Sequence, residues 1–180
     1  LTSVTVQFPY IFDGNGKTIT RNAATSSLFE KLTGEIRNLT LDGELNLIAK
    51  GNPPTAGGAP FVTSIYVGAK IIGCTNNMNV TFNAKGHCYV TGIAAVAVRN
   101  DTEGFELMEI SDCTNNGTIT GTVDVSSDSY NVAIAGIIGD VRASVGKVHY
   151  DVVLTNCKNT APITLSPKSG TGSTYGMTVC

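Results

Sequence analysis

One stretch occurs three times and decides the fold: Ile71-Ile72-Gly73-Cys74-Thr75-Asn76-Asn77, Ile110-Ser111-Asp112-Cys113-Thr114-Asn115-Asn116 and Leu154-Thr155-Asn156-Cys157-Lys158-Asn159-Thr160. A fourth, earlier copy is Ile36-Arg37-Asn38-Leu39-Thr40-Leu41-Asp42, with leucine in place of the cysteine. The steps from Leu39 through the three cysteines are 35, 39 and 44 residues. Six residues past this position each copy has an aliphatic residue: Leu45, Val80, Ile119 and Ile163. Repetition at such a period is typical of solenoid proteins.

A second element alternates with the first. It is Gly92-Ile93-Ala94-Ala95, Gly136-Ile137-Ile138-Gly139 and Gly176-Met177-Thr178-Val179, and we align Ser64-Ile65-Tyr66-Val67 and Ser27-Leu28-Phe29 with it as weaker copies. Each repeat is therefore expected to hold three short strands. The connections differ in length, which predicts protruding loops at Asn83–Gly86, Asn100–Leu107, Val125–Asn131 and Arg142–Tyr150. Equal strands with unequal loops favour a solenoid, because each repeat packs only on its neighbours.

Stacked repeats would place equivalent side chains in rows about 4.8 Å apart. We expect one interior row of Ile36, Ile71, Ile110 and Leu154, and a second of Leu39, Cys74, Cys113 and Cys157. Asn38, Asp112 and Asn156 are expected to bond the backbone at a corner, with Gly73 interrupting their row. Gly92, Gly136 and Gly176 suit places where two sheets approach closely. The predicted fold is all-β: a right-handed parallel β-helix of about four to five coils with inserted loops, in a single domain over residues 1–180.

The composition agrees with many short strands and turns. The 180 residues include 23 Thr, 15 Asn and 20 Gly; threonine favours pleated surfaces, while asparagine and glycine favour tight turns. Charged residues are only 14% and the net charge is −2, which argues against a nucleic-acid binder that relies on phosphate contacts. No apolar run reaches about 18 residues, so no membrane-spanning helix is expected. We expect a mature protein or a segment of a longer surface protein.

The chain resembles bacterial surface β-helix proteins with GLUG-type repeats, found in Bacteroidetes. The resemblance rests on the opening Asp13-Gly14-Asn15-Gly16-Lys17-Thr18-Ile19, on Ser27-Leu28-Phe29, on residues 34–43, and on the later Cys-x-Asn-x-x-x-(Ile/Val)-Thr and Gly-Ile-x-Gly elements. It covers about residues 8 to 179, although Gly136 to Gly139 alone keeps both glycines, and Ser64 and Ala95 depart from the pattern. It implies a right-handed parallel β-helix at the cell surface and no shared catalytic residue.

The five cysteines are Cys74, Cys88, Cys113, Cys157 and Cys180. There is no Cys-x-x-Cys pair and there are only two histidines, so we expect no metal and no cofactor. Three cysteines share one repeat position, which favours buried free thiols that act as small apolar residues. A disulfide that involves Cys88 or Cys180 stays open as an alternative. A catalytic thiol is disfavoured, because neither His87 nor His149 lies in a nucleophile motif; both are expected on surface loops.

Four further patterns have an ordinary interpretation that we prefer. Asp13-Gly14-Asn15-Gly16 is expected to be a turn, since it lacks the spacing and the final glutamate of an EF-hand. The Thr-x-Thr pattern of an ice-binding face is broken on successive repeats. The acids Asp101, Glu103, Glu106 and Glu109 are expected to form a solvated face. We ascribe the glycosylation-type sequons at Asn38, Asn79, Asn100 and Asn116 to chance in Asn- and Thr-rich turns.

Loops on a rigid scaffold are where recognition is usually found. The aromatic residues that we select as candidate binding residues on such loops are Tyr89, Phe105, Tyr130 and Tyr150. We expect a non-enzymatic, adhesin-like module, extracellular or at the cell surface, that binds a glycan or a host or bacterial surface protein. One alternative is a structural stalk or assembly subunit that associates end to end. The other is a carbohydrate-active enzyme, a polysaccharide lyase or a glycoside hydrolase, that uses loop acids such as Glu103 and Glu106.

Overall fold

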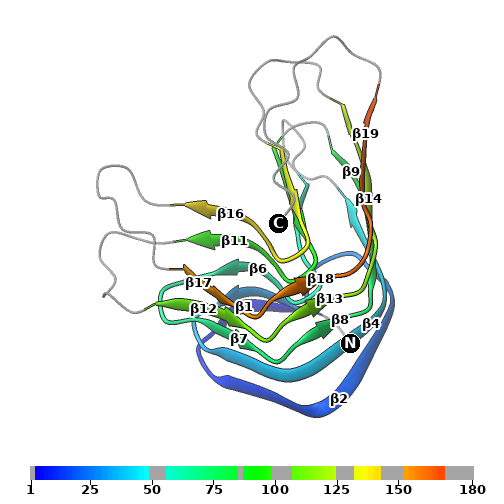
Figure 1. Ribbon diagram of the computed structural model, residues 1–180. Coiled ribbons are helices and arrows are strands. Elements are labelled where there is room, and N and C mark those ends of the chain that lie inside the picture. Colours follow the sequence, from blue (N-terminus) through cyan, green and yellow to red (C-terminus); the bar gives the residue numbers. More distant parts are fainter. Residues whose placement is uncertain are drawn as a thin grey trace.

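The computed structural model of the chain describes residues 3–48, 56–84, 87–98, 107–124, 132–142 and 152–168. Within these ranges the protein consists of strands and short connections and has no helix, so the fold is all-β (Figure 1). The described segments accordingly include no helix that could cross a lipid bilayer.

The strands form three sheets, and every strand pair in them is parallel. The five-stranded sheet has the order β1 (Val4–Phe8), β3 (Phe29–Leu32), β6 (Val62–Ile65), β11 (Ala94–Val98) and β16 (Ile138–Arg142). The three-stranded sheet has the order β15 (Val132–Ala135), β10 (Cys88–Thr91) and β5 (Ala56–Gly58). The eleven-stranded sheet contains β2 (Ile11–Ala24), β4 (Glu35–Ile48), β7 (Lys70–Ile72), β8 (Thr75–Asn76), β9 (Asn79–Ala84), β12 (Met108–Ser111), β13 (Thr114–Asn115), β14 (Ile119–Asp124), β17 (Val152–Thr155), β18 (Lys158–Asn159) and β19 (Ile163–Lys168).

The chain visits these sheets in a recurring order. From β4 onward it passes from the eleven-stranded sheet to the three-stranded sheet, then to the five-stranded sheet, and back. Each visit adds a strand beside the one laid down in the preceding repeat, as the layered ribbons in Figure 1 show. Because parallel sheets are normally covered on their apolar faces, the inner faces of all three sheets meet in one core.

The strand register aligns the residues of the first predicted row and the aliphatic positions that follow the cysteines. Ile36 pairs with Ile71, Ile71 with Ile110, and Ile110 with Leu154. The aliphatic positions Leu45, Val80, Ile119 and Ile163 are likewise paired in succession. Leu154 departs from the expectation of an interior row, because 46% of its surface is exposed. It lies on β17, the last strand of its sheet, and no described strand covers it.

The four residues that directly precede Leu39, Cys74, Cys113 and Cys157 form a corner, and all of them have left-handed backbone angles. Asn38, Gly73, Asp112 and Asn156 have φ angles of 51°, 61°, 53° and 51°. Gly73 therefore belongs to the row that we expected it to interrupt, since glycine and asparagine both tolerate this conformation. The side chains also bond each other rather than the backbone: the Asn156 amide donates to the Asp112 carboxylate at 2.7 Å. The Asn38 amide donates to Asp13 at 3.2 Å.

The alignment of the second element is wrong at one copy. Phe29 and Ala94 both pair with Val62, so Pro60 and not Ser64 stands at the position of Ser27 and Gly92. The true copy is Pro60-Phe61-Val62-Thr63, which has proline in place of glycine. Ser64 pairs with Lys31 and Val96, farther along the same strands.

A buried asparagine row lies inside the stack and was not expected. The Asn76 amide donates to Asn115 Oδ1 at 2.6 Å, and the Asn115 amide donates to Asn159 Oδ1 at 2.7 Å. Each amide also donates to the carbonyl two residues on, at 2.9–3.1 Å. Gly92 and Gly136 press against this row, because an added Cβ would lie 2.3 Å from Asn115 Cγ or 2.4 Å from Asn159 Cβ. This confirms the close approach predicted at both glycines.

The core is continuous through the repeats and is most aromatic at its first end. Phe29 is buried and contacts Phe8 and Phe12, with ring centroids 4.9 Å and 5.6 Å apart. Phe12 pairs with Ile36, so it begins the aliphatic row one strand earlier. Three of the four predicted loops, and Gly176, lie wholly or largely outside the described residues. The fourth starts inside β9, which runs to Ala84.

Candidate functional site

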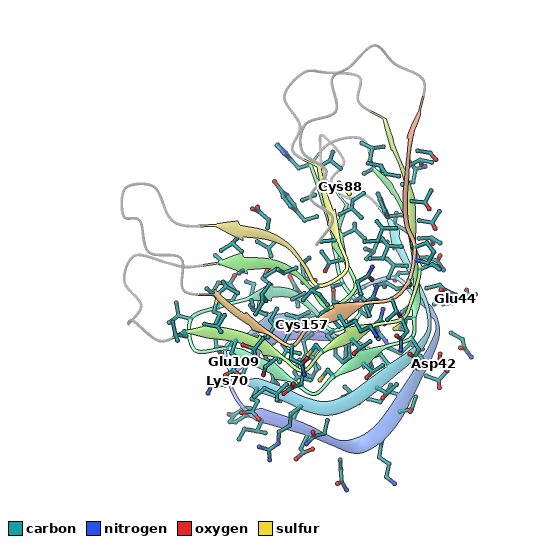
Figure 2. All side chains as sticks on the ribbon, viewed as in Figure 1. Asp42, Glu44, Lys70, Cys88, Glu109 and Cys157 are labelled. Atoms are coloured by element: carbon teal, nitrogen blue, oxygen red, sulfur yellow. The ribbon has the colours of Figure 1, made fainter. Side chains whose placement is uncertain are left out.

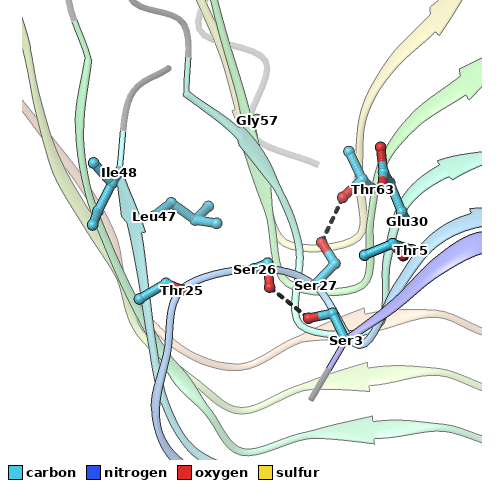
Figure 3. A pocket seen from close by; sticks show the side chains of 10 residues that line it. All are labelled: Ser3, Thr5, Thr25, Ser26, Ser27, Glu30, Leu47, Ile48, Gly57 and Thr63. Carbon is cyan, nitrogen blue, oxygen red and sulfur yellow. Dashed lines mark hydrogen bonds between the residues drawn. The ribbon is translucent and has the colours of Figure 1, made fainter.

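The candidate site is a cleft of about 400 Å³ at the end of the stack that the first strands of the chain form, here called the first end. It opens where β1, β3 and β6 of the five-stranded sheet face the end of β4 and the edge strand β5 (Figure 3). Six hydroxyl side chains, one carboxylate and two aliphatic side chains dominate its lining, which consists of Ser3, Thr5, Thr25, Ser26, Ser27, Glu30, Leu47, Ile48, Gly57 and Thr63.

The strand register brings part of this lining together. Phe29 pairs with Val62 in a continuous register, so Glu30 and Thr63 lie side by side on the outer face of the five-stranded sheet. Thr5 lies next to them on β1, at the irregularity where the register of β1 shifts after Val4. Side chains alternate between the two faces of a strand, so this outer row follows directly from the buried one. Figure 3 shows these three side chains on neighbouring strands, opposite Leu47.

Serine side chains from the connection between β2 and β3 complete the floor. Ser27 Oγ lies 2.8 Å from Thr63 Oγ1 and accepts a hydrogen bond from the Ala59 backbone N–H at 3.2 Å. Ser26 Oγ shares a hydrogen bond with Ser3 Oγ, which precedes β1 (Figure 3). The two hydroxyl pairs fix four of the polar groups, so the floor is ordered before any ligand arrives.

A buried arginine stands behind the Ser3–Ser26 pair. Arg21, on β2, is only 5% exposed; its Nη1 donates to the Ser26 carbonyl at 3.0 Å and its Nη2 to Ser3 Oγ at 3.2 Å. Its Nε is buried and has no hydrogen-bond partner. No ion pair joins Arg21 to a carboxylate in the described part of the chain. Burial lowers the pKa of Arg21, but a guanidinium stays protonated at neutral pH.

Tyr89 was predicted to lie on a loop, and this is wrong. It is in β10, half-buried, and packs against the small apolar cluster of Ala59, Ala95 and Val96. Tyr89 pairs with Gly57, so it lies one strand along from the cleft on the same face of the three-stranded sheet. A Cβ at Gly57 would meet only the Tyr89 carbonyl oxygen, at 4.0 Å, so this wall of the cleft is open. The other three candidate aromatics, Phe105, Tyr130 and Tyr150, lie outside the described residues.

The cysteine row is a chain of thiols that bond to backbone. Cys74 and Cys113 are fully buried and Cys157 is half-buried. Each thiol donates to the carbonyl of the isoleucine one repeat earlier; the distance from Cys113 to Ile71 is 3.5 Å and that from Cys157 to Ile110 is 3.2 Å. Cys88 is also buried and free, and burial raises its pKa to about 12. Figure 2 labels Cys88 at the three-stranded sheet and Cys157 between β17 and β18.

The thiol contacts change the pKa values within the row. The neighbouring Cys113 thiol and burial raise the pKa of Cys157 above its ordinary value. For Cys113 the Cys157 contact lowers the pKa, but the Cys74 contact and burial outweigh it and raise the pKa to about 12. The contact with Cys113 lowers the pKa of Cys74 against the effect of burial. Thiols that are hydrogen-bonded and mostly buried are better suited to a structural role in the core than to nucleophilic chemistry.

Five of the described charged residues form ion pairs on the outer face of the eleven-stranded sheet. Lys70 Nζ lies 3.8 Å from Glu109 on the neighbouring strand (Figure 2), and Arg37 bridges Asp13 at 2.8 Å and Glu35 at 3.2 Å. The Asn15 backbone N–H and Arg37 lower the pKa of Asp13. The turn predicted at Asp13–Gly16 is instead an irregularity inside β2, where the register shifts and Asn15 and Gly16 have positive φ angles. Asp101, Glu103 and Glu106 lie outside the described residues. Within the described ranges no group of three His, Cys, Asp or Glu side chains is placed to hold a metal ion.

Sequence reasoning missed the cleft, because its lining comes from separate elements and no motif joins them. The available signal was the hydroxyl run Thr25-Ser26-Ser27 between two strands, with the inward-facing Arg21 just before it. Comparisons of the chain with protein-family models, with curated proteins and with solved structures found no match.

Proposed function

We propose that the chain is a non-enzymatic, adhesin-like module, exposed at a cell surface, that binds a glycan in the cleft at Ser27 and Thr63. The observation that carries the proposal is the ordered hydroxyl floor beside an apolar wall. Saccharides are polyols with apolar ring faces, so they need many hydrogen-bonding groups together with apolar or aromatic contact. Leu47 and Ile48 are part of the lining and supply that apolar contact.

The scaffold that we infer is a right-handed parallel β-helix. Its support is the recurring passage through the three sheets and the parallel in-register pairing of equivalent residues. Right-handed connection is the strong rule for parallel strands joined by a crossover. Such a scaffold suits recognition, because a stack of paired strands holds a site rigid while its edges and connections vary.

The test is a glycan array with three proteins. The folded parent should bind a defined set of glycans, and heat-denatured parent should not. The Gly57→Leu variant should lose this binding, because the new side chain extends into the cleft while its Cβ meets no close neighbour. The matched control is Thr120→Leu, an exposed position on the eleven-stranded sheet, and it should bind like the parent.

Two results would contradict the proposal. If parent and Gly57→Leu bind the same glycans equally, the cleft is not the site. If chromatography of a bound oligosaccharide after incubation shows shortened products, the module is an enzyme, and the loop acids become the candidates.

A second candidate function, an assembly subunit, is favoured by the last strands of the stack. Val153 and Leu154 on β17 are 39% and 46% exposed, and β17 is an edge strand. The Asn159 side-chain nitrogen has two hydrogens, and the described residues accept one of them, at Ala161. An in-register strand of another subunit would cover the leucine and accept the second hydrogen.

A further inference from the structure

The position of Arg21 indicates the chemical class of the ligand. Burying a charge away from water is costly unless an opposite charge or several hydrogen bonds compensate for it. Arg21 is 5% exposed, and two of its nitrogens donate to Ser26 O and Ser3 Oγ while Nε has no partner. The protein therefore holds a cation next to the cleft that the described residues do not neutralise.

Hydrogen bonds through the serine pair connect Arg21 to the cleft surface. Ser3 Oγ accepts a hydrogen bond from Arg21, and it shares one further bond with Ser26 Oγ. The two hydroxyls have two hydrogens, and one is used between them. The other has no acceptor among the described residues whichever serine donates, so the pair can present a donor to the cleft that both residues line. A donor polarised by a neighbouring cation prefers an anionic acceptor.

The cleft lining also includes a carboxylate, that of Glu30. Glu30 lies on β3 between Thr5 and Thr63, away from the Ser3–Ser26 pair in Figure 3. A carboxylate there accepts hydrogen bonds from ligand hydroxyls and repels a second anion. The cleft thus has a donor pair next to a cation at Ser3 and Ser26, and an anion at Glu30. This difference in charge orients a ligand that has one acidic group and several hydroxyls.

We propose that the cleft binds an acidic saccharide, with its carboxylate or sulfate on the Ser3–Ser26 pair in the field of Arg21 and its hydroxyls toward Glu30 and Thr63. This inference rests on the proposed function, since it names the glycan class for the same cleft. Uronic acids and sulfated sugars share the required chemistry, and the two arms of the experiment separate them.

The experiment is calorimetric titration with three probes: a galacturonic acid trisaccharide, its neutral methyl ester, and a sulfated galactose trisaccharide. The acid or the sulfate should bind at least about tenfold more tightly than the ester, because hydrogen bonds to charged groups are stronger than neutral ones. Whichever of the two binds more tightly identifies the anion.

Two variants connect this preference to the named residues. Ser26→Ala removes the donor and keeps the backbone carbonyl that Arg21 uses; it should weaken the anion about tenfold and leave the ester unchanged. Arg21→Gln should act in the same direction, and the Ser26→Ala result stands if that variant does not fold. The control Thr120→Leu should change neither affinity.

The two proposals fail differently. If no probe and no glycan of the array binds in a way that Gly57→Leu abolishes, the proposed function itself is wrong. If glycans bind in that way but the ester equals the acid and the sulfate, or if Ser26→Ala weakens acid and ester alike, the charge-based selectivity is overturned while the glycan site stands. Arg21 is then a structural residue at the end of the core.

Discussion

At the scale of single residues, the protein keeps polar groups in its interior by giving each one several partners. Asn76 and Asn115 are fully buried, and their amides bond both the next asparagine and a backbone carbonyl. Buried amides are tolerated only when they are satisfied, and connected chains of them strengthen one another. The row ends at Leu41, which pairs with Asn76, so the interior changes from amide to aliphatic in the first repeat.

The Asn115→Ala variant should therefore be strongly destabilised. The change removes the acceptor of one Asn76 amide hydrogen and the side-chain donor to the Gly117 carbonyl, and it opens space beside Gly92. Unsatisfied buried groups cost about 1–3 kcal/mol each, so the free energy of unfolding should fall by about 2–4 kcal/mol in urea denaturation. The adjacent control Asn116→Ala breaks only exposed bonds, to Asn77 and Thr160, and should cost less than about 1 kcal/mol. Equal losses in the two variants would contradict a structural role for the row.

At the scale of elements, one left-handed corner conformation recurs directly before Leu39 and before each cysteine of the cysteine row. Asn38, Asp112 and Asn156 adopt it in spite of the steric cost to residues with a Cβ, and Gly73 adopts it freely. A Cβ at Gly73 would lie 3.3 Å from Asn38 Oδ1, so this side-chain oxygen would have to move by a few tenths of an ångström. Because that neighbour is the end of a side chain, the backbone angle is the stronger restriction on which residues this corner accepts.

This argument predicts opposite behaviour for two substitutions at one position. Gly73→Asn should change the free energy of unfolding by less than about 1 kcal/mol, because asparagine tolerates the left-handed region and occurs at the equivalent corners. Gly73→Val should lower it by about 1–3 kcal/mol, because a β-branched residue is strained there. Thermal unfolding followed by circular dichroism measures both. A valine variant as stable as the asparagine variant would show that the corner is not left-handed in solution.

The elements also show what the sequence could predict. Rows such as Ile36 to Leu154 were predictable, because parallel in-register pairing places equivalent residues of successive repeats side by side. The copy at Pro60 was misaligned, because it has proline where the other copies have glycine or serine. The cleft was not predictable in the same way. Its hydroxyls come from different strands, and their approach depends on the outer face, where repetition leaves no pattern.

At the scale of the whole molecule, the two ends of the stack differ. The first end carries aromatic packing around Phe29 and the inward-facing Arg21. The last end exposes Val153, Leu154 and the outer side of the asparagine row. An unpaired strand edge with apolar side chains is a template for adding another strand. Unlike ends can join only head to tail, which generates open chains of subunits rather than a closed dimer.

The assembly prediction follows from this polarity. Sedimentation velocity of the parent at increasing concentration should show a growing series of oligomers and not a monomer–dimer equilibrium. Leu154→Lys should remain monomeric, because a charge on the edge strand opposes both apolar burial and strand addition. Thr164→Lys, an exposed position on β19 of the same repeat, adds the same charge away from the interior row and should still associate. A parent that stays monomeric at the highest concentration, or a Leu154→Lys variant that associates as the parent does, would show that this end is not an assembly surface.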